Sequence, residues 1–341
     1  MKNSLIYYSV GALLYCPANN KSITNSIISE KFGKQYSLAL CLEDTIHDNH
    51  VLEAEDIMLN SLKTIYEASK NKIFYIPKIF VRVRNAKQMY RIFYALGESI
   101  DILCGFILPK FSLDNADDYI DVLLRINQES SKPIYAMPIY ENSSIVDLRH
   151  RYDILYTLKD KLSPIEELIL NIRVGGNDLC HVFGFRRQDN ESIHQIKPIS
   201  NIFSDIITVY GSDYVISGPV WEYYNSSNWE NGLIAEIKDD KLCGFIGKTV
   251  IHPNQIAVVN DAYKVSSKDL EDAKSILNWD DSLHSLVSGN IVAERMNEYK
   301  THYNWALQTI LMAEAFGTKE HLKQIDLDYP KRLFNLTYTN F

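Results

Sequence analysis

The sequence has no long apolar run and no cluster of basic residues. No apolar stretch in its 341 residues approaches the roughly 20 residues that a helix needs to cross a bilayer. The formal net charge is −8, and no block of lysines and arginines stands out. A polyanion would therefore find no basic surface to bind. We expect neither a membrane nor a nucleic acid as a partner.

Cysteine is scarce, and its distribution excludes a disulfide framework. The five cysteines are odd in number, widely spaced and mostly set in apolar runs: Cys16, Cys41, Cys104, Cys180 and Cys243. This pattern predicts buried free thiols in a reducing cytoplasm, and it disfavours a metal cluster. A catalytic cysteine is disfavoured because none adjoins a histidine in a setting typical of a nucleophile. The N-terminal segment LIYYSVGALLYC lacks the cleavage site of a signal peptide, which agrees with a cytoplasmic location.

Nucleotide-binding loops are also missing. Neither a GxGxxG nor a GxxxxGK[ST] loop follows the first predicted strand. Nucleotide binding, the usual function of an open doubly wound sheet, is therefore unsupported. The chain has instead eight near-continuous apolar runs, as parallel strands covered on both faces require. They are residues 11–16, 37–43, 78–83, 102–108, 134–140, 168–174, 213–219 and 244–251. Segments with helical spacing lie between them, among them 53–69, 86–96, 116–126, 144–158 and 198–210.

This alternation predicts an α/β fold, a (β/α)8 TIM barrel, over residues 1–264. The length fits a barrel of roughly 250 residues with an appendage. After the eighth run no further strand alternation is expected, and residues 266–276 and 293–316 are expected to be helical or irregular. We interpret residues 265–341 as a C-terminal helical extension that covers the barrel mouth or contacts a neighbouring subunit.

Two acidic residues follow the fifth and sixth predicted strands, Glu141 in AMPIYEN and Asp178 in NIRVGGND. Carboxyl ends of barrel strands open onto one face, so these two carboxylates are expected side by side. Such a pair, with positions left for water and substrate, suits a Mg²⁺ site. Gly175 and Gly176 would leave room for a ligand. The alternative is that both acids cap the helices that follow them, and the spacing does not decide between the two.

Two arginines mark the end of the third predicted strand. Arg82 and Arg84 alternate with valines in IFVRVRN, which predicts that both point to the same face. A guanidinium there suits a substrate carboxylate or carbonyl. The alternative is an internal ion pair with Glu43 or Asp44, at the end of the second strand. That acidic pair could do acid–base chemistry itself, or it could hold Arg82 in place.

Lys110 ends the segment FILPK and could attract an anionic substrate, or it could simply be solvated. We group it with Arg84 and with Asn19, from the loop after the first strand, as the predicted substrate-binding residues. His252 precedes Pro253, which restricts it to an extended backbone, and we interpret it as structural.

Several motifs in order resemble one known family. GFIGKTVIHPNQI is similar to a signature of citrate lyase beta subunit-like proteins, within the HpcH/HpaI aldolase superfamily. LYCPANN, LCLEDT, VRVRN, ILPK, IYEN and GGNDL follow the family's other motifs in the same order, over about residues 10–265. The stretch ISGPVWEYY and the long C-terminal region are more similar to a divergent subgroup, the TIM-barrel C–C bond lyases.

The resemblance implies a TIM barrel with a Mg²⁺-dependent site that cleaves carbon–carbon bonds. It implies that Glu141 and Asp178 hold the metal and that Arg82 binds the substrate, supported by Glu43 and Asp44. Retro-aldol or retro-Claisen cleavage leaves an enolate, whose charge a metal ion and a guanidinium would stabilise. It also implies a homo-oligomer, a trimer or larger.

In the family's lyases that act on acyl-CoA, a further acid in the C-terminal segment reaches the site of a neighbouring subunit. The corresponding stretch here is Met296-Asn297-Glu298, so the resemblance assigns this role to Glu298. The chain departs from the family pattern at Ala18, where glycine is usual, and at Ser217, where aspartate is expected. Residues 185–197 resemble an insertion. Because CoA and substrate contacts gather at these places in the family, a free acid and a CoA thioester both stay open as substrates.

The leading hypothesis is a Mg²⁺-dependent carbon–carbon lyase acting on a hydroxy- or oxo-acid or its CoA thioester. One alternative is an enzyme similar to malate synthase that condenses two substrates or hydrolyses a thioester. The other is a non-catalytic barrel that serves as a subunit or binding module of a biosynthetic complex.

Overall fold

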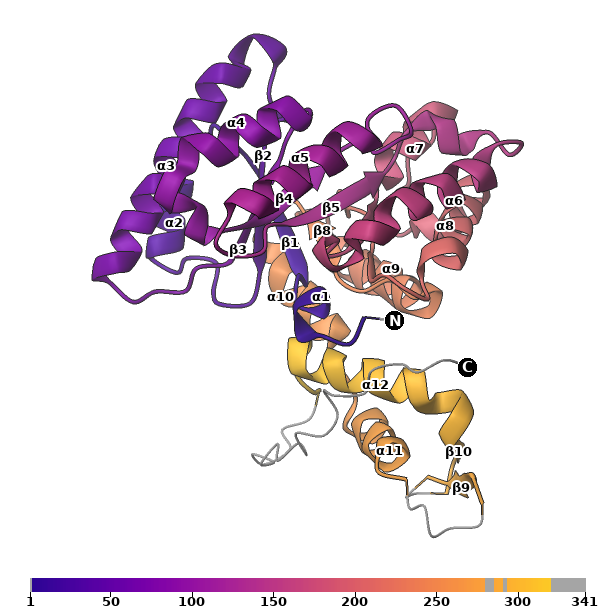
Figure 1. The fold of residues 1–341 in the computed structure, drawn as a ribbon. Coiled ribbons are helices and arrows are strands. Elements are labelled where there is room, and N and C mark those ends of the chain that lie inside the picture. The colour runs from indigo at the N-terminus through magenta and orange to yellow at the C-terminus, as the bar shows by residue number, and fades with distance from the viewer. Residues whose placement is uncertain (1, 280–284, 291–292, 320–341) are drawn as a thin grey trace.

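The computed structural model describes residues 2–279, 285–290 and 293–319, and it contains the predicted barrel (Figure 1). Eight parallel strands pair in the order β7-β6-β5-β4-β3-β2-β1-β8. A further parallel bridge between Gly218 and Lys248 joins the region of β7 to β8 and closes the ring. The strands are β1 (Ala12–Pro17), β2 (Ser37–Cys41), β3 (Lys78–Arg82), β4 (Leu103–Leu108), β5 (Tyr135–Tyr140), β6 (Ile172–Val174), β7 (Ile216–Ser217) and β8 (Lys248–Val250).

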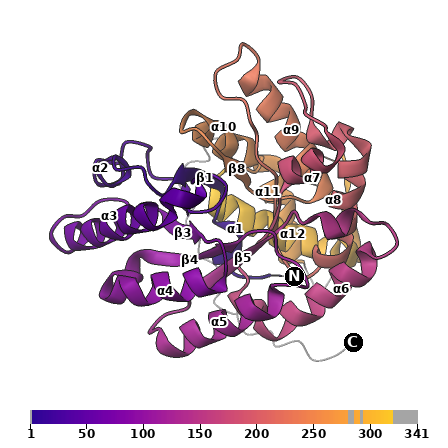
Figure 2. The same cartoon turned by 90° about the horizontal axis from the view of Figure 1, so that it is seen from above.

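Helices surround the strands, as the view from above shows (Figure 2). They are α2 (Ile23–Ile28), α3 (Val51–Asn71), α4 (Ala86–Leu96), α5 (Ala116–Glu129), α6 (Arg151–Leu162), α7 (Gly176–Phe183), α8 (Lys197–Tyr210), α9 (Trp229–Cys243) and α10 (Asn254–Tyr263), and the short α1 (Leu5–Tyr8) precedes β1. Their apolar faces bury the outer side of the sheet, and strands such as β2 are buried at every position. Continuous apolar runs predicted these strands because both of their faces are covered.

Local sequence fixes where the elements begin and end. The Asn85 side chain accepts a hydrogen bond of 2.9 Å from the backbone N–H of Gln88 and so starts α4 directly after β3. Gly184 ends α7 in the left-handed conformation, with φ 69°. The helix predicted over residues 144–158 is a 3₁₀ turn at Ser143–Val146 followed by α6, which begins only at Arg151.

The C-terminal extension contains α11 (Ser267–Leu277), α12 (Tyr299–Phe316) and a short antiparallel pair of strands, β9 (Val287–Gly289) and β10 (Met296–Glu298). The expectation of no further strands after the barrel was therefore wrong. Within the segment 293–316, expected to be helical or irregular, the helix begins at Tyr299. It follows Ala293, whose φ is positive at 55°, and β10.

Helix α12 packs at the amino ends of the barrel strands (Figure 1). It contacts α1, and the Phe316 ring stacks on Tyr263 with centroids 5.2 Å apart, beside Gly11 at the start of β1. Within the described chain the extension thus lies at the end of the barrel opposite to the carboxyl ends of the strands. No described helix is both long and apolar enough to cross a membrane.

Candidate active site at the carboxyl ends of the strands

Arg82 is the centre of a charged cluster at the carboxyl end of β3. Its Nη2 lies 2.7 Å from Glu43 Oε2, 2.9 Å from Asp44 Oδ2 and 3.1 Å from Glu141 Oε1. These residues follow three different strands, and the parallel arrangement brings them together at one end of the barrel. The arginine is buried, so its charge needs these carboxylates.

Lys110 belongs to the same cluster and faces its acids. The Lys110 Nζ lies 2.5 Å from Glu43 Oε1 and 3.0 Å from Asp44 Oδ1. Its backbone N–H donates to Glu141 Oε1 at 3.0 Å, from a residue whose φ of 49° is unusual outside glycine. The strained backbone of Lys110 therefore serves to hold the Glu141 carboxylate.

Arg84 lies apart from the cluster. Strand β3 ends at Arg82, so the alternation that predicted a shared face for both arginines stops before Arg84. Its guanidinium donates to the backbone carbonyls of Leu42 at 2.8 Å and Ile46 at 2.6 Å, and it pairs with Asp48. Arg84 thus braces the loop that carries the two acids after β2. Asn19 is exposed in the loop after β1, and neither Arg84 nor Asn19 lines the cavity described next.

A cavity of about 240 Å³ opens beside Arg82 at the carboxyl ends of the strands. Its lining residues come mostly from strand ends and the loops after them: Tyr15, Asp44, Arg82, Ile139, Glu141, Arg173, Val174, Gly175, Gly176, Asn177, Asp178, Val220, Thr249 and Ile251. Glu141 and Asp178 both line it, as the metal-site prediction requires. Lys110, the third predicted substrate-binding residue, does not line this cavity either.

Glu141 is almost fully buried, while Asp178, in the first turn of α7, is half-buried. Burial raises the pKa of Glu141 to about 8; Arg82 counteracts this rise, and Asp178 adds to it. The charged form of Glu141 is therefore destabilised by burial and by the nearby Asp178, and a cation beside both carboxylates would stabilise it.

The residues around this pair fit a Mg²⁺ ion. A Cβ added at Gly175 would lie 2.2 Å from both Cβ and Oε2 of Glu141, so only glycine leaves the carboxylate in its place. Within the described residues no three His, Cys, Asp or Glu side chains gather as a complete ligand set. Mg²⁺ does not need one, because it is often held by one or two carboxylates and keeps waters and substrate oxygens as its other ligands.

Tyr15, Arg173 and Thr249 are among the lining residues that were not predicted from the sequence. Arg173 on β6 donates to Thr249 Oγ1 at 2.6 Å, and Tyr15 on β1 lies with its ring 5.9 Å from the Arg82 guanidinium. Arg173 could have been found, because it interrupts the apolar run of its strand between Ile172 and Val174 as Arg82 does in β3. Tyr15 and Thr249 gave no comparable signal, since both residue types are common in strands.

Glu298 does not join the cluster of its own chain. It ends β10 on the extension, and its backbone N–H donates to His302 Nδ1 at 2.9 Å. The extension packs at the amino ends of the strands, whereas the cavity lies at their carboxyl ends. A catalytic role for Glu298 would require a neighbouring copy of the chain, and that role stays a prediction.

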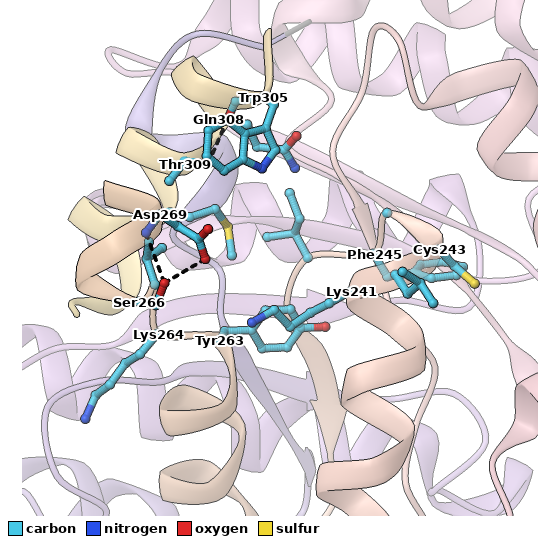
Figure 3. A pocket seen from close by; sticks show the side chains of 15 residues that line it. Lys241, Cys243, Phe245, Tyr263, Lys264, Ser266, Asp269, Trp305, Gln308 and Thr309 are labelled. Atoms are coloured by element: carbon cyan, nitrogen blue, oxygen red, sulfur yellow. Dashed lines mark hydrogen bonds between the residues drawn. The ribbon is translucent and has the colours of Figure 1, made fainter. Parts of the chain in front are cut away.

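A cavity of about 360 Å³ lies at the opposite end, between the barrel and the extension (Figure 3). Lys241, Tyr263, Asp269 and Trp305 are among its lining residues. The Asp269 carboxylate already accepts a hydrogen bond from Ser266 and pairs with Arg295, each at 2.7 Å.

The five cysteines are free, as predicted, but Cys243 is exposed and Cys104 is half-buried. Its Sγ lies 3.7 Å from His194 Nδ1, an approach between residues 49 positions apart in the sequence. Partial burial and the nearby Asp240 raise the pKa of the Cys243 thiol, which disfavours the thiolate needed of a nucleophile.

A family model described as C–C bond lyase of the TIM-barrel fold matches residues 4–318. Among solved structures, a citrate lyase from Burkholderia xenovorans is similar with a TM-score of 0.68 and 12% identity, covering 91% of this chain and 93% of that one. The protein CitE from Mycobacterium tuberculosis, in complex with magnesium, acetoacetate and coenzyme A, gives a TM-score of 0.58 and 16% identity over 90% of this chain and 99% of that one.

A curated protein also matches over a short segment. A (3S)-malyl-CoA thioesterase from Cereibacter sphaeroides is 33% identical over 94 residues, which is 28% of this chain. The chain spans about a third of the length of that relative, 33%.

Proposed function

This chain belongs to the family of C–C bond lyases of the TIM-barrel fold, and from that premise we propose that it is a Mg²⁺-dependent carbon–carbon lyase. Its substrate would be a small hydroxy- or oxo-acid, free or as a CoA thioester, cleaved by retro-aldol or retro-Claisen chemistry. The observation that carries the proposal is the pair Glu141 and Asp178 in one cavity beside the Arg82 guanidinium.

Glu141 and Asp178 would hold Mg²⁺. When bound, the ion would supply Lewis-acid stabilisation of the negative charge that develops on a substrate oxygen. Magnesium is present with acetoacetate and coenzyme A in the similar CitE structure, which supports the choice of ion.

The side chains of this chain would accept the proton and stabilise the charge of the product. In retro-aldol cleavage the substrate hydroxyl loses its proton, the carbon–carbon bond breaks, and its electron pair becomes an enolate. The acid pair Glu43 and Asp44, of which Asp44 lines the cavity, is the proton acceptor in this proposal. Arg82, held by both acids, would donate hydrogen bonds to the oxyanion of the product. Because Arg82 is fixed before substrate arrives, little reorganisation is needed during the reaction.

The test is a screen of the purified protein with Mg²⁺ against hydroxy-acids and hydroxyacyl-CoA thioesters, with products identified by mass spectrometry. The proposal expects two carbon fragments from at least one substrate. Glu141→Gln should reduce turnover at least about 100-fold, since several kcal/mol of charge stabilisation would be lost. Glu98→Gln is the matched control, because that glutamate is 86% exposed on the surface.

Turnover by Glu141→Gln at the wild-type rate would remove this carboxylate from the mechanism. Binding of Mg²⁺ and acid with no cleavage of any substrate would favour a non-catalytic binding module instead.

A second activity has one observation in its favour, the partial match to a malyl-CoA thioesterase. Thioester hydrolysis or condensation would use the same metal and enolate chemistry. The same screen separates the two, because hydrolysis releases free CoA and an intact acid, whereas lyase activity divides the carbon chain.

A further inference from the structure

Arg173 is a buried cation that has no carboxylate partner among the residues that the structure describes. Its side chain, on β6, is 2% exposed. It donates to Thr249 Oγ1 at 2.6 Å and lies 3.4 Å from Asn171 Oδ1, and both of these partners are neutral. Within the described residues no acidic side chain forms an ion pair with it. Burial lowers the pKa of Arg173, as expected for a cation that little nearby charge stabilises.

The other buried arginines of the barrel do not share this property. Arg82 has three carboxylates, Arg151 pairs with Asp205 at 2.7 Å, and Arg187 pairs with Glu236 at 3.0 Å. A buried guanidinium without such a partner destabilises the fold. Its presence therefore requires another reason, and a ligand that brings its own negative charge would be one.

Arg173 lines the same cavity as the predicted metal pair. Around that cavity, Arg82 and Lys110 are neutralised by Glu43 and Asp44. A divalent cation would in turn be neutralised by Glu141 and Asp178. Arg173 is then the positive charge that remains in the cavity, and a substrate anion is the group that would balance it.

We propose that Arg173 binds a second anionic group of the substrate and selects small acids with two carboxylates over acids with one. The inference rests on the proposed function, because it assumes that the first carboxylate or the hydroxyl group of the substrate binds at the Mg²⁺ site. The planar guanidinium suits the two oxygens of a carboxylate, and Thr249 holds it in place. The cavity of about 240 Å³ suits an acid of few carbons.

The test compares two acids that share one end and differ at the other. Malate and 2-hydroxybutyrate both carry a 2-hydroxycarboxylate that can bind Mg²⁺, but only malate ends in a second carboxylate. Titration calorimetry of the Mg²⁺-loaded wild-type protein should show malate binding about 10- to 100-fold more tightly, as a hydrogen bond to a charged group implies. Arg173→Met should bring the two affinities within a few-fold of each other without weakening 2-hydroxybutyrate. Arg186→Met, at an arginine that is 76% exposed, is the matched control and should keep the preference.

Two further readouts separate this role from a structural one. Without ligand, Arg173→Met should melt at the same or a higher temperature, because an uncompensated buried charge has been removed. A lower melting temperature with the malate preference intact would make Arg173 structural and overturn the proposal. The wild-type comparison tests it without any variant: equal affinity for the two acids, or no binding of either, would also overturn it.

The outcome is distinct from that of the lyase proposal, whose readout is product formation. A protein that prefers malate yet cleaves no acid would retain this inference and lose the lyase. A lyase that binds both acids with equal affinity would retain the lyase proposal and overturn this inference.

Discussion

At the scale of single residues, the surroundings of the Glu141 carboxylate favour the binding of a cation. It is nearly buried, Arg82 and the Lys110 N–H hold one of its oxygens, and Gly175 leaves no side chain in the space around it. Burial raises its pKa to about 8, so near neutral pH much of the metal-free protein carries a proton there.

This proton predicts a pH-dependent affinity for Mg²⁺. The raised pKa means that the proton stabilises the metal-free fold at low pH, and that this contribution is lost as the pH rises through about 8. Since the ion needs the deprotonated carboxylate, its affinity should increase about tenfold per pH unit from 6 to 8 and level off above. Calorimetric titration with Mg²⁺ between pH 6 and 9 measures this. A constant affinity across that range would show that Glu141 does not compete with the proton for the metal.

The residues of the site could be predicted where they end an apolar strand. Arg82 and Glu141 interrupt or follow such runs, and they lie together because parallel strands end at one face. Arg84 could not be placed, because the end of β3 at Arg82 breaks the alternation on which its prediction depended. Arg173 interrupts its own strand in the same way, between Ile172 and Val174, but it was not predicted.

At the scale of elements, all eight strands were predictable and several helices were not. Helix α9 has weak amphipathic periodicity because its inner face buries two acids, Glu236 and Asp240, next to apolar residues. They share Lys248 on β8, which is fully buried and lies 2.9 Å from Glu236 Oε1 and 2.6 Å from Asp240 Oδ2. Glu236 also pairs with Arg187, and Asp240 with His194. Hydrophobic periodicity cannot detect a helix that packs through charges, since the signal comes from apolar residues alone.

This buried network predicts a large effect of Lys248→Met on stability. Removing the cation leaves Asp240 buried with His194 as its remaining partner and Glu236 with Arg187, which should lower the free energy of unfolding by about 3–5 kcal/mol. Urea denaturation followed by circular dichroism measures the change. Lys63→Met, at an exposed position of α3, should stay within about 0.5 kcal/mol of wild type. If both variants were equally stable, the ion pairs between α9 and β8 would contribute nothing to their packing.

At the scale of the whole molecule, the barrel carries different parts at its two ends. The charged cavity lies at the carboxyl ends of the strands, and the C-terminal extension packs at the amino ends. The sequence could predict that helices follow the barrel, because their apolar spacing is clear. It could not predict which end they pack against, since that depends on contacts between residues as distant in the sequence as Gly11 and Phe316.

The separation of the two ends predicts that Phe316→Ala affects stability and leaves the site intact. Phe316 is 5% exposed and its ring stacks on Tyr263, so truncation should leave a cavity and lower the free energy of unfolding by about 3–5 kcal/mol. Tyr94→Ala, at a tyrosine that is 69% exposed, is the control and should change little. Below the melting temperature, the Mg²⁺ affinity of Phe316→Ala should equal that of wild type, because the ion would bind at the other end of the strands. A parallel loss of Mg²⁺ affinity in the folded variant would mean that the extension controls the geometry of the site through the barrel, and that the two ends are coupled.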